Sequence, residues 1–524
     1  MGPKSSQEKR SKWVRRSLKV FGVLTVLLVL GITVGLWLLV TSDEREPSRV
    51  AFAEHCASCH GAALEGSPDG PPLVGDMAAL EEPVDQIAAR IEDVHADQDL
   101  EVWRDSISSE SIRALALFVS ERRQRWPSTI DSYRLPTQTP AVDSRLHGFR
   151  VERWAELTGA PYSLAPLPDG RVLVAEKSRG LSIIDANGRL GSTISGTPEV
   201  FDPLVSVRGM KAHIGSMLDV QLHPHYAENG WIYLSYAHRC ESGCGVPWPK
   251  SMVRVVRGRI RGDQWTDEEL IWSVDPRYYT VVPDNVACGR LAFDNSGFLY
   301  VTVGGKAPYK HLHDLDTPYG KIHRVHDDGT VPGDNPVFEP SATRTEGSTR
   351  HTVFSFGHRT AQGLTGDPET GAIWSTEMGP RGGDEINHIV AGGNYGWPLY
   401  TAGLDYDGEP NTIGTDLGLD FPFESTVPPV VDLSPAPAVS NLTFYAGDAF
   451  PGWEGDLLVG SLKARTLYRM RFLDPERVEL EKLVTDIGRI RDVEVGADGL
   501  VYIAVDHQDR SLVLRLVPEP MRSP

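Results

Sequence analysis

A short turn followed by an alternating apolar strand recurs along most of this chain, and this recurrence limits the possible folds more than any other feature. From residue 146 onward, Asp-Gly, Asn-Gly and Gly-Asp turns border apolar runs, as in LPDGRVLVAEK, NSGFLYVTVGG, EGDLLVGSLKARTLYRMRF and ADGLVYIAVD. A turn dipeptide beside an alternating run is typical of antiparallel β-structure. The units recur roughly every 60 residues, which suits four-stranded blades in a radial arrangement. Residues 146–519 are therefore predicted to form an all-β six-bladed propeller, and a double β-sandwich is the alternative.

The N-terminal segment predicts a membrane anchor. Residues 1–19 contain seven basic side chains and one acidic side chain, and no charged residue occurs from Phe21 to Val40. An apolar helix of about 20 residues spans the hydrocarbon core of a bilayer. We therefore expect a cytoplasmic tail at residues 1–19, a single transmembrane helix at residues 20–41, and the remaining chain in the periplasm of a bacterial inner membrane. A cleaved signal peptide is the alternative, but no small-residue cleavage site follows the apolar run.

Composition restricts the number of domains and the partners. The chain has 524 residues and a net charge of −19. This length exceeds what one compact core contains, so at least two domains are expected. Nucleic acid is excluded as a partner, because its recognition requires a basic footprint. Residues 49–125 have apolar positions at helical spacing and predict a small all-α domain, while the Pro/Thr-rich residues 126–145 predict a linker.

The helical region contains the motif CASCH, which includes Cys56, Cys59 and His60. In such a motif the two thiols form thioethers with haem, and the adjacent histidine becomes an axial iron ligand. A zinc site or a redox-active thiol pair would explain neither His60 nor the GPPL run that begins at Gly70. The sequence therefore predicts a covalently attached haem c.

With this motif, residues 49–125 resemble the small monohaem cytochromes c. The resemblance implies that Pro71 supports the proximal histidine and that a methionine before the last helix supplies the second axial ligand. In this chain Leu100 stands at the methionine position, and leucine cannot ligate iron. His95, Met77 and an open sixth position remain as alternatives, with His95 and the open position preferred over Met77.

Three further cysteines lie in the predicted propeller. Cys240 and Cys244 are close together in a loop after an apparent strand. In an oxidising compartment they are expected to form a local disulfide, and half of a zinc site is the alternative. Cys288 is predicted to be buried and unreactive.

Five segments of the predicted propeller carry a specific pattern. They read FGHRTAQGL from Phe356, EMGPRGGDEIN from Glu377, GNYGWP from Gly393, GSLK from Gly460 and GRIRDV from Gly488. With these segments, residues 146–519 resemble the soluble sugar (aldose) dehydrogenases that depend on pyrroloquinoline quinone (PQQ), a family of six-bladed β-propellers. The resemblance implies an oxidoreductase with PQQ and Ca²⁺ as cofactors.

The resemblance also implies where PQQ binds. Lys463, Arg489 and Arg491 match the cations that bind PQQ in the family, and Arg359, followed by Thr360, matches the arginine that contacts its quinone end. PQQ is a tricarboxylate, and arginine suits bidentate recognition of carboxylates. An exposed surface charge is the alternative for each basic residue.

A glycine-rich loop is the candidate calcium site. Gly379, Pro380 and Asp384 match the family's calcium loop, and carbonyl and carboxylate oxygens are the ligands that Ca²⁺ prefers. A tight turn with its own capping acid is the alternative.

The chain departs from the family on the substrate side. Val286 stands where the family has its general base, a histidine, and valine cannot accept a proton. Gly305 stands where the family has an acidic substrate contact. His213 is our candidate for a relocated base, since its loop normally faces the site and imidazole can accept a hydroxyl proton. A surface or packing histidine is the alternative.

These observations predict a membrane-anchored quinohaemoprotein. PQQ would oxidise a sugar or an alcohol, and the haem would pass single electrons to a respiratory electron acceptor. One alternative is a degenerate propeller that binds its cofactor without turnover, with the haem as an electron carrier or sensor. The other is a carbohydrate-binding or interaction propeller.

Overall fold

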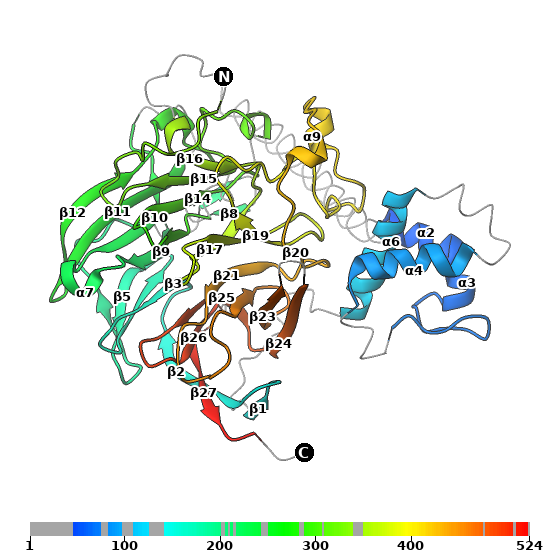
Figure 1. Ribbon diagram of the computed structural model, residues 1–524, viewed down its shortest axis with the longest axis horizontal. Coiled ribbons are helices and arrows are strands. Elements are labelled where there is room, and N and C mark those ends of the chain that lie inside the picture. Colours follow the sequence, from blue (N-terminus) through cyan, green and yellow to red (C-terminus); the bar gives the residue numbers. More distant parts are fainter. Residues whose placement is uncertain are drawn as a thin grey trace, which may run out of the picture. The chain divides into compact units, whose positions relative to one another are not determined.

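The computed structural model describes residues 46–74, 82–96, 108–124, 141–200, 205–207, 210–212, 216–242, 250–281, 288–306, 309–338, 349–474, 477–506 and 510–521. The chain divides into two compact units: a helical one, which ends at Gln124 apart from the short segment Asp405–Glu409, and a larger β-structured one (Figure 1). Each unit is described by itself.

Among the described residues, six antiparallel sheets of four or five strands form the larger unit, and the alternating runs of the sequence supply strands to them. Blade 1 contains β3 (Pro161–Pro166), β4 (Val172–Glu176), β5 (Gly180–Ile184) and β6 (Leu190–Thr193). Blade 2 contains β9 (Met217–Leu222), β10 (Ile232–Arg239), β11 (Ser251–Arg261) and β12 (Gln264–Trp272). Blade 3 contains β13 (Leu291–Phe293), β14 (Leu299–Val303), β15 (Lys321–Val325) and β16 (Val353–Phe356). Blade 4 contains β17 (Ala361–Gly366), β18 (Ile373–Glu377), β19 (Glu385–Ile389) and β20 (Val431–Asp432). Blade 5 contains β21 (Val439–Phe444), β22 (Leu457–Ser461), β23 (Leu467–Asp474) and β24 (Arg477–Val484).

The sixth sheet joins the two ends of the propeller. It contains β25 (Arg489–Val495), β26 (Val501–Asp506), β27 (Ser511–Glu519), β2 (Gly148–Leu157) and β1 (Ala141–Asp143). Short connecting elements are the hairpin β7 (Val205–Val207) and β8 (Met210–Ala212), the helices α7 (Tyr226–Asn229) and α9 (Ile413–Asp416), and 3₁₀ turns at Pro276–Tyr278, Tyr309–His311, Arg350–Thr352 and Phe423–Ser425.

The sheets form a closed ring. Their first strands are in contact in the order β3, β9, β13, β17, β21, β25 and back to β3, so these strands line the axis. Strand β2, from the start of the unit, pairs antiparallel with β27, near its end, and closes the last blade. Radial closure of this kind leaves only short sheet edges. The predicted six-bladed propeller is confirmed, and the double β-sandwich is wrong.

The propeller core lies between the blades. Every residue of β4 and of β22 is buried, because each middle strand packs against a neighbouring blade on both faces. Among the largest buried side chains, Trp453 is stacked on Phe450 with ring centroids 4.4 Å apart. The turns follow the sequence signal: Gly170 of an Asp-Gly pair has a φ of 83°, which glycine adopts without strain.

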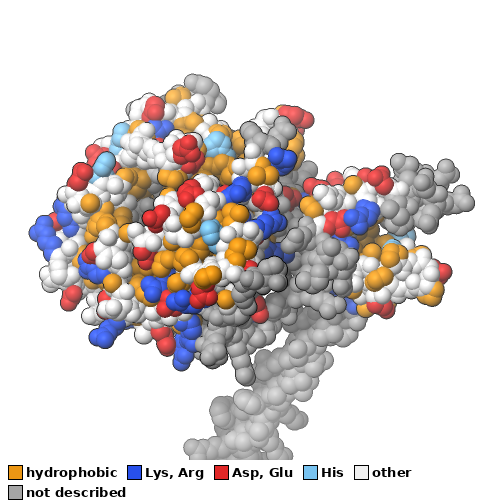
Figure 2. Space-filling view, turned by 60° about the horizontal axis from the view of Figure 1, so that its bottom comes forward, with side chains coloured by type: hydrophobic (Ala, Val, Ile, Leu, Met, Phe, Trp, Pro, Cys, Tyr) orange, Lys and Arg blue, Asp and Glu red, His pale blue; other side chains and the backbone are white. Residues whose placement is uncertain are grey.

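The outer strands face solvent. Strand β12 exposes the acidic run Asp267–Glu269 while Trp265 and Trp272 at its ends remain buried. Basic, acidic and apolar side chains of the described residues are interspersed on the face in Figure 2. Charges of both signs on the outer strands keep the sheet edges soluble.

The helical unit contains α2 (Pro47–His55), α3 (Ala57–His60), α4 (Val84–Ala96) and α6 (Ser109–Gln124). Ser108 caps the last helix, since its Oγ accepts a hydrogen bond from the backbone N–H of Ser111 at 3.2 Å. A core of Phe52, Leu64, Leu115, Phe118 and Val119 holds the helices together, with the rings of Phe52 and Phe118 5.6 Å apart. The predicted all-α domain is confirmed.

None of the described helices has the length and apolarity to cross a membrane. The predicted anchor at residues 20–41 and the tail at residues 1–19 lie outside the described residues. The predicted linker, residues 126–145, lies outside them except for its last five residues.

Candidate functional site

Most of the predicted cofactor residues of the propeller lie at one face. In each blade the second strand is antiparallel to the first, so the first strand begins and the second strand ends at the same face. Arg359 and Thr360 precede β17, Arg489 and Arg491 begin β25, and Lys463 follows the end of β22. The topology therefore brings together residues that are more than 100 positions apart.

Arg359 is held rigidly at this face. Its side chain is buried, its guanidinium donates to the Met378 carbonyl at 2.8 Å, and it lies 5.3 Å from the centre of the Trp397 ring. Its backbone N–H donates to the carboxylate of Glu377. The neighbouring Thr360 is also buried, and its Oγ1 makes no hydrogen bond among the described residues.

A buried relay of polar groups braces the Arg359 backbone. The imidazole of His358 lies 2.9 Å from Glu377 Oε2 through Nδ1 and 2.8 Å from Ser355 Oγ through Nε2. Because the carboxylate can only accept, Nδ1 donates to it and Nε2 accepts from the serine hydroxyl. The FGHR segment stands out in the sequence, but no local pattern predicts that His358 and Glu377 meet.

Gly305 packs against the same segment. Its N–H donates to the Arg359 carbonyl at 2.7 Å, and a Cβ atom at Gly305 would lie 2.3 Å from the His358 carbonyl oxygen. The backbone fold therefore leaves no room for the acidic side chain that the family has at this position.

A group of three basic side chains, Lys177, Arg489 and Arg491, surrounds Asp506; we call it the cation cluster. A terminal nitrogen of the Arg491 guanidinium lies 3.2 Å from Asp506 Oδ2, and Lys177 Nζ lies 3.9 Å from the same oxygen. Burial raises the pKa of Asp506, but Arg491 and Lys177 outweigh this effect and hold the pKa below its usual value. Burial and repulsion from Arg491 lower the pKa of Arg489. One carboxylate thus faces three cations.

Two observations indicate that this face accommodates an anion. The Nε of Arg491 is buried and makes no hydrogen bond among the described residues, like the hydroxyl of Thr360. Buried donors without partners are costly unless a ligand or water satisfies them. Lys463 is exposed on the bend after β22, where it can reach a ligand from the rim. These residues fit a polycarboxylate such as PQQ.

Lys177 was missed by sequence analysis. It follows the end of β4 in blade 1, as Lys463 follows the end of β22 in blade 5. The available signal was positional: a lysine placed just after a second strand belongs at the face where the other cations lie.

Arg290 closes the axis beneath this face. It is 1% exposed, and its guanidinium lies 3.2 Å from Asp219 Oδ1 and 2.9 Å from Asp492 Oδ1. The same group donates to the backbone carbonyls of Gln362 at 2.8 Å, of Arg491 at 3.0 Å and of Tyr162 at 3.2 Å. This single side chain thus joins strands of four other blades to its own blade.

The glycine-rich loop supports only part of the predicted calcium site. Asp384 Oδ1 accepts from the Gly379 N–H at 3.0 Å, and Oδ2 accepts from the Val439 N–H at 2.9 Å. The acid therefore braces the loop, which is the alternative that the sequence left open. A Cβ at Gly379 would lie 2.4 Å from the Gly382 carbonyl, so the loop is tightly folded. Among the described residues no group of three acidic, cysteine or histidine side chains could hold a metal ion.

Several predicted site residues cannot be placed. His213 and Val286 lie outside the described residues, as do Met77 and Leu100. His95 is part of α4, but its side chain is not described. The relocated base and the sixth iron ligand therefore stay predictions.

The haem motif has the geometry that an iron ligand needs. His60 Nδ1 lies 2.8 Å from the Pro71 carbonyl oxygen, so Nδ1 donates and Nε2 keeps its lone pair for iron. Burial and the neighbouring Cys59 raise the pKa of the Cys56 thiol to about 11. A redox-active thiol pair has a lowered pKa, and the shift at Cys56 is in the opposite direction.

The other cysteines agree with expectation as far as they are described. Cys240 is disulfide-bonded, and its predicted partner, Cys244, lies outside the described residues. Cys288 is buried and carries a thiol.

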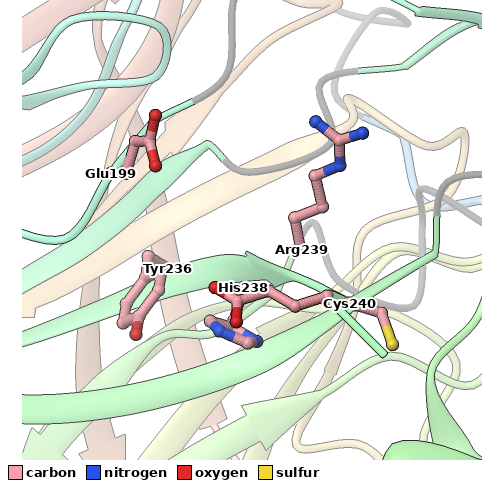
Figure 3. Close-up of a pocket in the computed structure, with 6 residues that line it drawn as sticks. Glu199, Tyr236, His238, Arg239 and Cys240 are labelled. Atoms are coloured by element: carbon pink, nitrogen blue, oxygen red, sulfur yellow. The ribbon is translucent and has the colours of Figure 1, made fainter. Parts of the chain in front are cut away.

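A separate pocket of about 380 Å³ opens at the end of β10 (Figure 3). It is lined by Glu199, Tyr236, His238, Arg239, Cys240 and Glu241. His238 Nδ1 lies 2.8 Å from the Tyr279 hydroxyl, and this contact orients the ring of His238. The pocket shares no residue with the cation cluster.

Comparisons with known proteins agree with the two units. Residues 158–514 match the family model "Glucose / Sorbosone dehydrogenase", and residues 47–112 match the model "Cytochrome c". The chain is 35% identical to the aldose sugar dehydrogenase YliI of Escherichia coli (strain K12) over 360 residues, which are 67% of this chain and 89% of that protein. It is 27% identical to quinoprotein glucose dehydrogenase B of Acinetobacter calcoaceticus, over 66% of this chain and 83% of that protein.

A solved structure also matches the propeller of this chain. The soluble aldose sugar dehydrogenase from Escherichia coli, in its apo form, superposes with a TM-score of 0.61 at 31% sequence identity. The match covers 71% of this chain and all of that structure.

Proposed function

The chain belongs to the glucose/sorbosone dehydrogenase family, and from this premise we propose that it oxidises an aldose with PQQ as the electron acceptor and passes the electrons to its own haem c. Membership of the family makes the chain an oxidoreductase, and the cytochrome c domain supplies a one-electron carrier. The observation that carries the proposal is the convergence of Arg359, Arg489, Arg491 and Lys463 on one face of the propeller.

In this proposal the described residues bind and orient. Arg489, Arg491 and Lys463 hold the carboxylates of PQQ, while Arg359, braced through Glu377, lies at the quinone end. The carbonyls of Gly379 and Pro380 hold Ca²⁺, and Asp384 keeps their loop closed. When bound, PQQ supplies a two-electron acceptor for the hydrogen that leaves the anomeric carbon of the sugar.

The base that takes the sugar hydroxyl proton is proposed to be His213. Val286 occupies the family's base position, so another group must accept the proton. The site is proposed to face the periplasm, with residues 20–41 as the membrane anchor and a respiratory carrier as the final acceptor.

A dye-linked assay tests the proposal. The purified full chain, loaded with PQQ and Ca²⁺, is expected to reduce an artificial electron acceptor in the presence of aldoses. A panel of alcohols tests substrate class, and a His213→Ala variant should lose most of its turnover while still binding PQQ. Absence of activity with every aldose and alcohol, in protein shown to bind PQQ, would favour the non-catalytic alternative.

A further inference from the structure

Lys177 belongs to none of the segments that carry the family pattern, yet the fold places it in the cation cluster. Its backbone N–H donates to the Ala160 carbonyl at 2.9 Å, and its carbonyl accepts from the Met217 N–H at 3.0 Å. These bonds tie Lys177 to the strands at the start of blades 1 and 2. The backbone of Lys177 is thus fixed at the face where the other cations lie.

The charge around Lys177 is not balanced within the described residues. Its nearest acid, Asp506, is 3.9 Å away and is already paired with Arg491 at 3.2 Å. A distance of 3.9 Å is beyond hydrogen-bond range, so this pair is weak. Lys177 Nζ also lies 5.8 Å from the centre of the Tyr162 ring, which provides only a modest attraction.

We propose that Lys177 is a further PQQ-binding residue, which donates a charge-assisted hydrogen bond to a carboxylate of the cofactor. This inference rests on the proposed function. A carboxylate placed in the cluster would give Lys177 a full partner and would also supply the acceptor that Arg491 Nε lacks among the described residues.

The proposal has a consequence for pH dependence. Burial, repulsion from Arg491 and the positive charges of Arg489 and Arg290 lower the pKa of Lys177 to about 7, against the attraction of Asp506. The groups that face it are Arg489 and Arg491 on β25, Asp506 at the end of β26, Arg290 before β13 and Tyr162 on β3, whose own pKa is raised by burial.

A bound carboxylate favours the charged lysine and therefore raises its pKa. Near and below pH 6 the amine is already protonated and binds the anion directly. Above pH 7 the free protein must first take up a proton, so PQQ should bind more weakly as the pH rises.

Isothermal titration calorimetry tests whether Lys177 binds PQQ. PQQ is titrated into the full, haem-bearing chain, which is prepared without PQQ. Wild-type protein with Ca²⁺ should bind PQQ about tenfold more weakly at pH 9 than at pH 6. This is the change in affinity expected when one charge-assisted hydrogen bond is lost. Lys177→Gln should bind about tenfold more weakly than wild type at pH 6 and show little further loss at pH 9. Lys177→Arg should bind as wild type does at pH 6 and keep that affinity at pH 9.

The control is Lys482→Gln on the outermost strand of blade 5, which should match wild type at both pH values. Thermal unfolding of each variant checks that it is folded. If Lys177→Gln does not fold, Lys177→Arg still tests the inference through the pH dependence of its PQQ affinity. Equal affinity and equal pH dependence of the Lys177 variants and wild type would overturn the inference while leaving the proposed function intact. Failure of the wild-type chain to bind PQQ would overturn the proposed function and this inference with it.

Discussion

At the scale of single residues, the axis of the propeller depends on Arg290. Its guanidinium is buried with two carboxylates and three backbone carbonyls, which come from four other blades. Burial opposes its charge, but Asp492 and Asp219 outweigh this effect and raise the pKa of Arg290. The residue therefore stays charged and holds the strand that carries Arg491.

Replacing Arg290 should destabilise the propeller strongly. Arg290→Met leaves Asp219 and Asp492 buried without a counter-charge, and such a loss costs about 3–5 kcal/mol. Denaturant unfolding of the variant measures the free energy directly. Arg171→Met is the control, because that exposed pair with Asp169 contributes less than about 1 kcal/mol. Equal stability of the two variants would contradict the role of Arg290.

At the scale of elements, alternation and turn dipeptides predicted the strands and the six blades, and apolar positions at helical spacing predicted the helical domain. The face that holds the cofactor residues follows from topology once the blades are known. Two contacts near the cofactor face did not follow from sequence, the His358–Glu377 pair and the position of Lys177, whereas the bracing role of Asp384 is one of the two alternatives that the sequence left open. These depend on side chains that distant strands bring together, and local periodicity does not report such contacts.

The haem loop provides a prediction at this scale. Gly70 lies so close to the attachment helix that a Cβ would be 2.7 Å from the Cys59 carbonyl oxygen. Gly70→Ala should displace the loop, weaken the bond between His60 and the Pro71 carbonyl, and reduce the fraction of chains that carry haem. Mass spectrometry of the purified protein measures that fraction. Asp69→Ala, at an exposed neighbouring position, should retain wild-type haem content, and full haem content in Gly70→Ala would contradict the packing argument.

At the scale of the whole molecule, the chain combines a dehydrogenase propeller with a cytochrome c domain. Oxidation of an aldose releases two electrons, whereas a haem accepts one, so each sugar oxidised should reduce two haem groups or one haem and a further acceptor. Both units keep their cofactor anchors, His60 with Pro71 in one and the buried arginines in the other. Both units thus retain the residues that our proposal of electron transfer from PQQ to haem requires.

Stopped-flow spectroscopy of the haem tests this account most directly. An aldose is mixed with the oxidised, PQQ- and Ca²⁺-loaded full chain, and the absorbance of the reduced haem is followed. The account predicts haem reduction at a rate that does not depend on protein concentration, because the electrons move within one chain. A haem that stays oxidised with every aldose, although dithionite reduces it, would contradict the account.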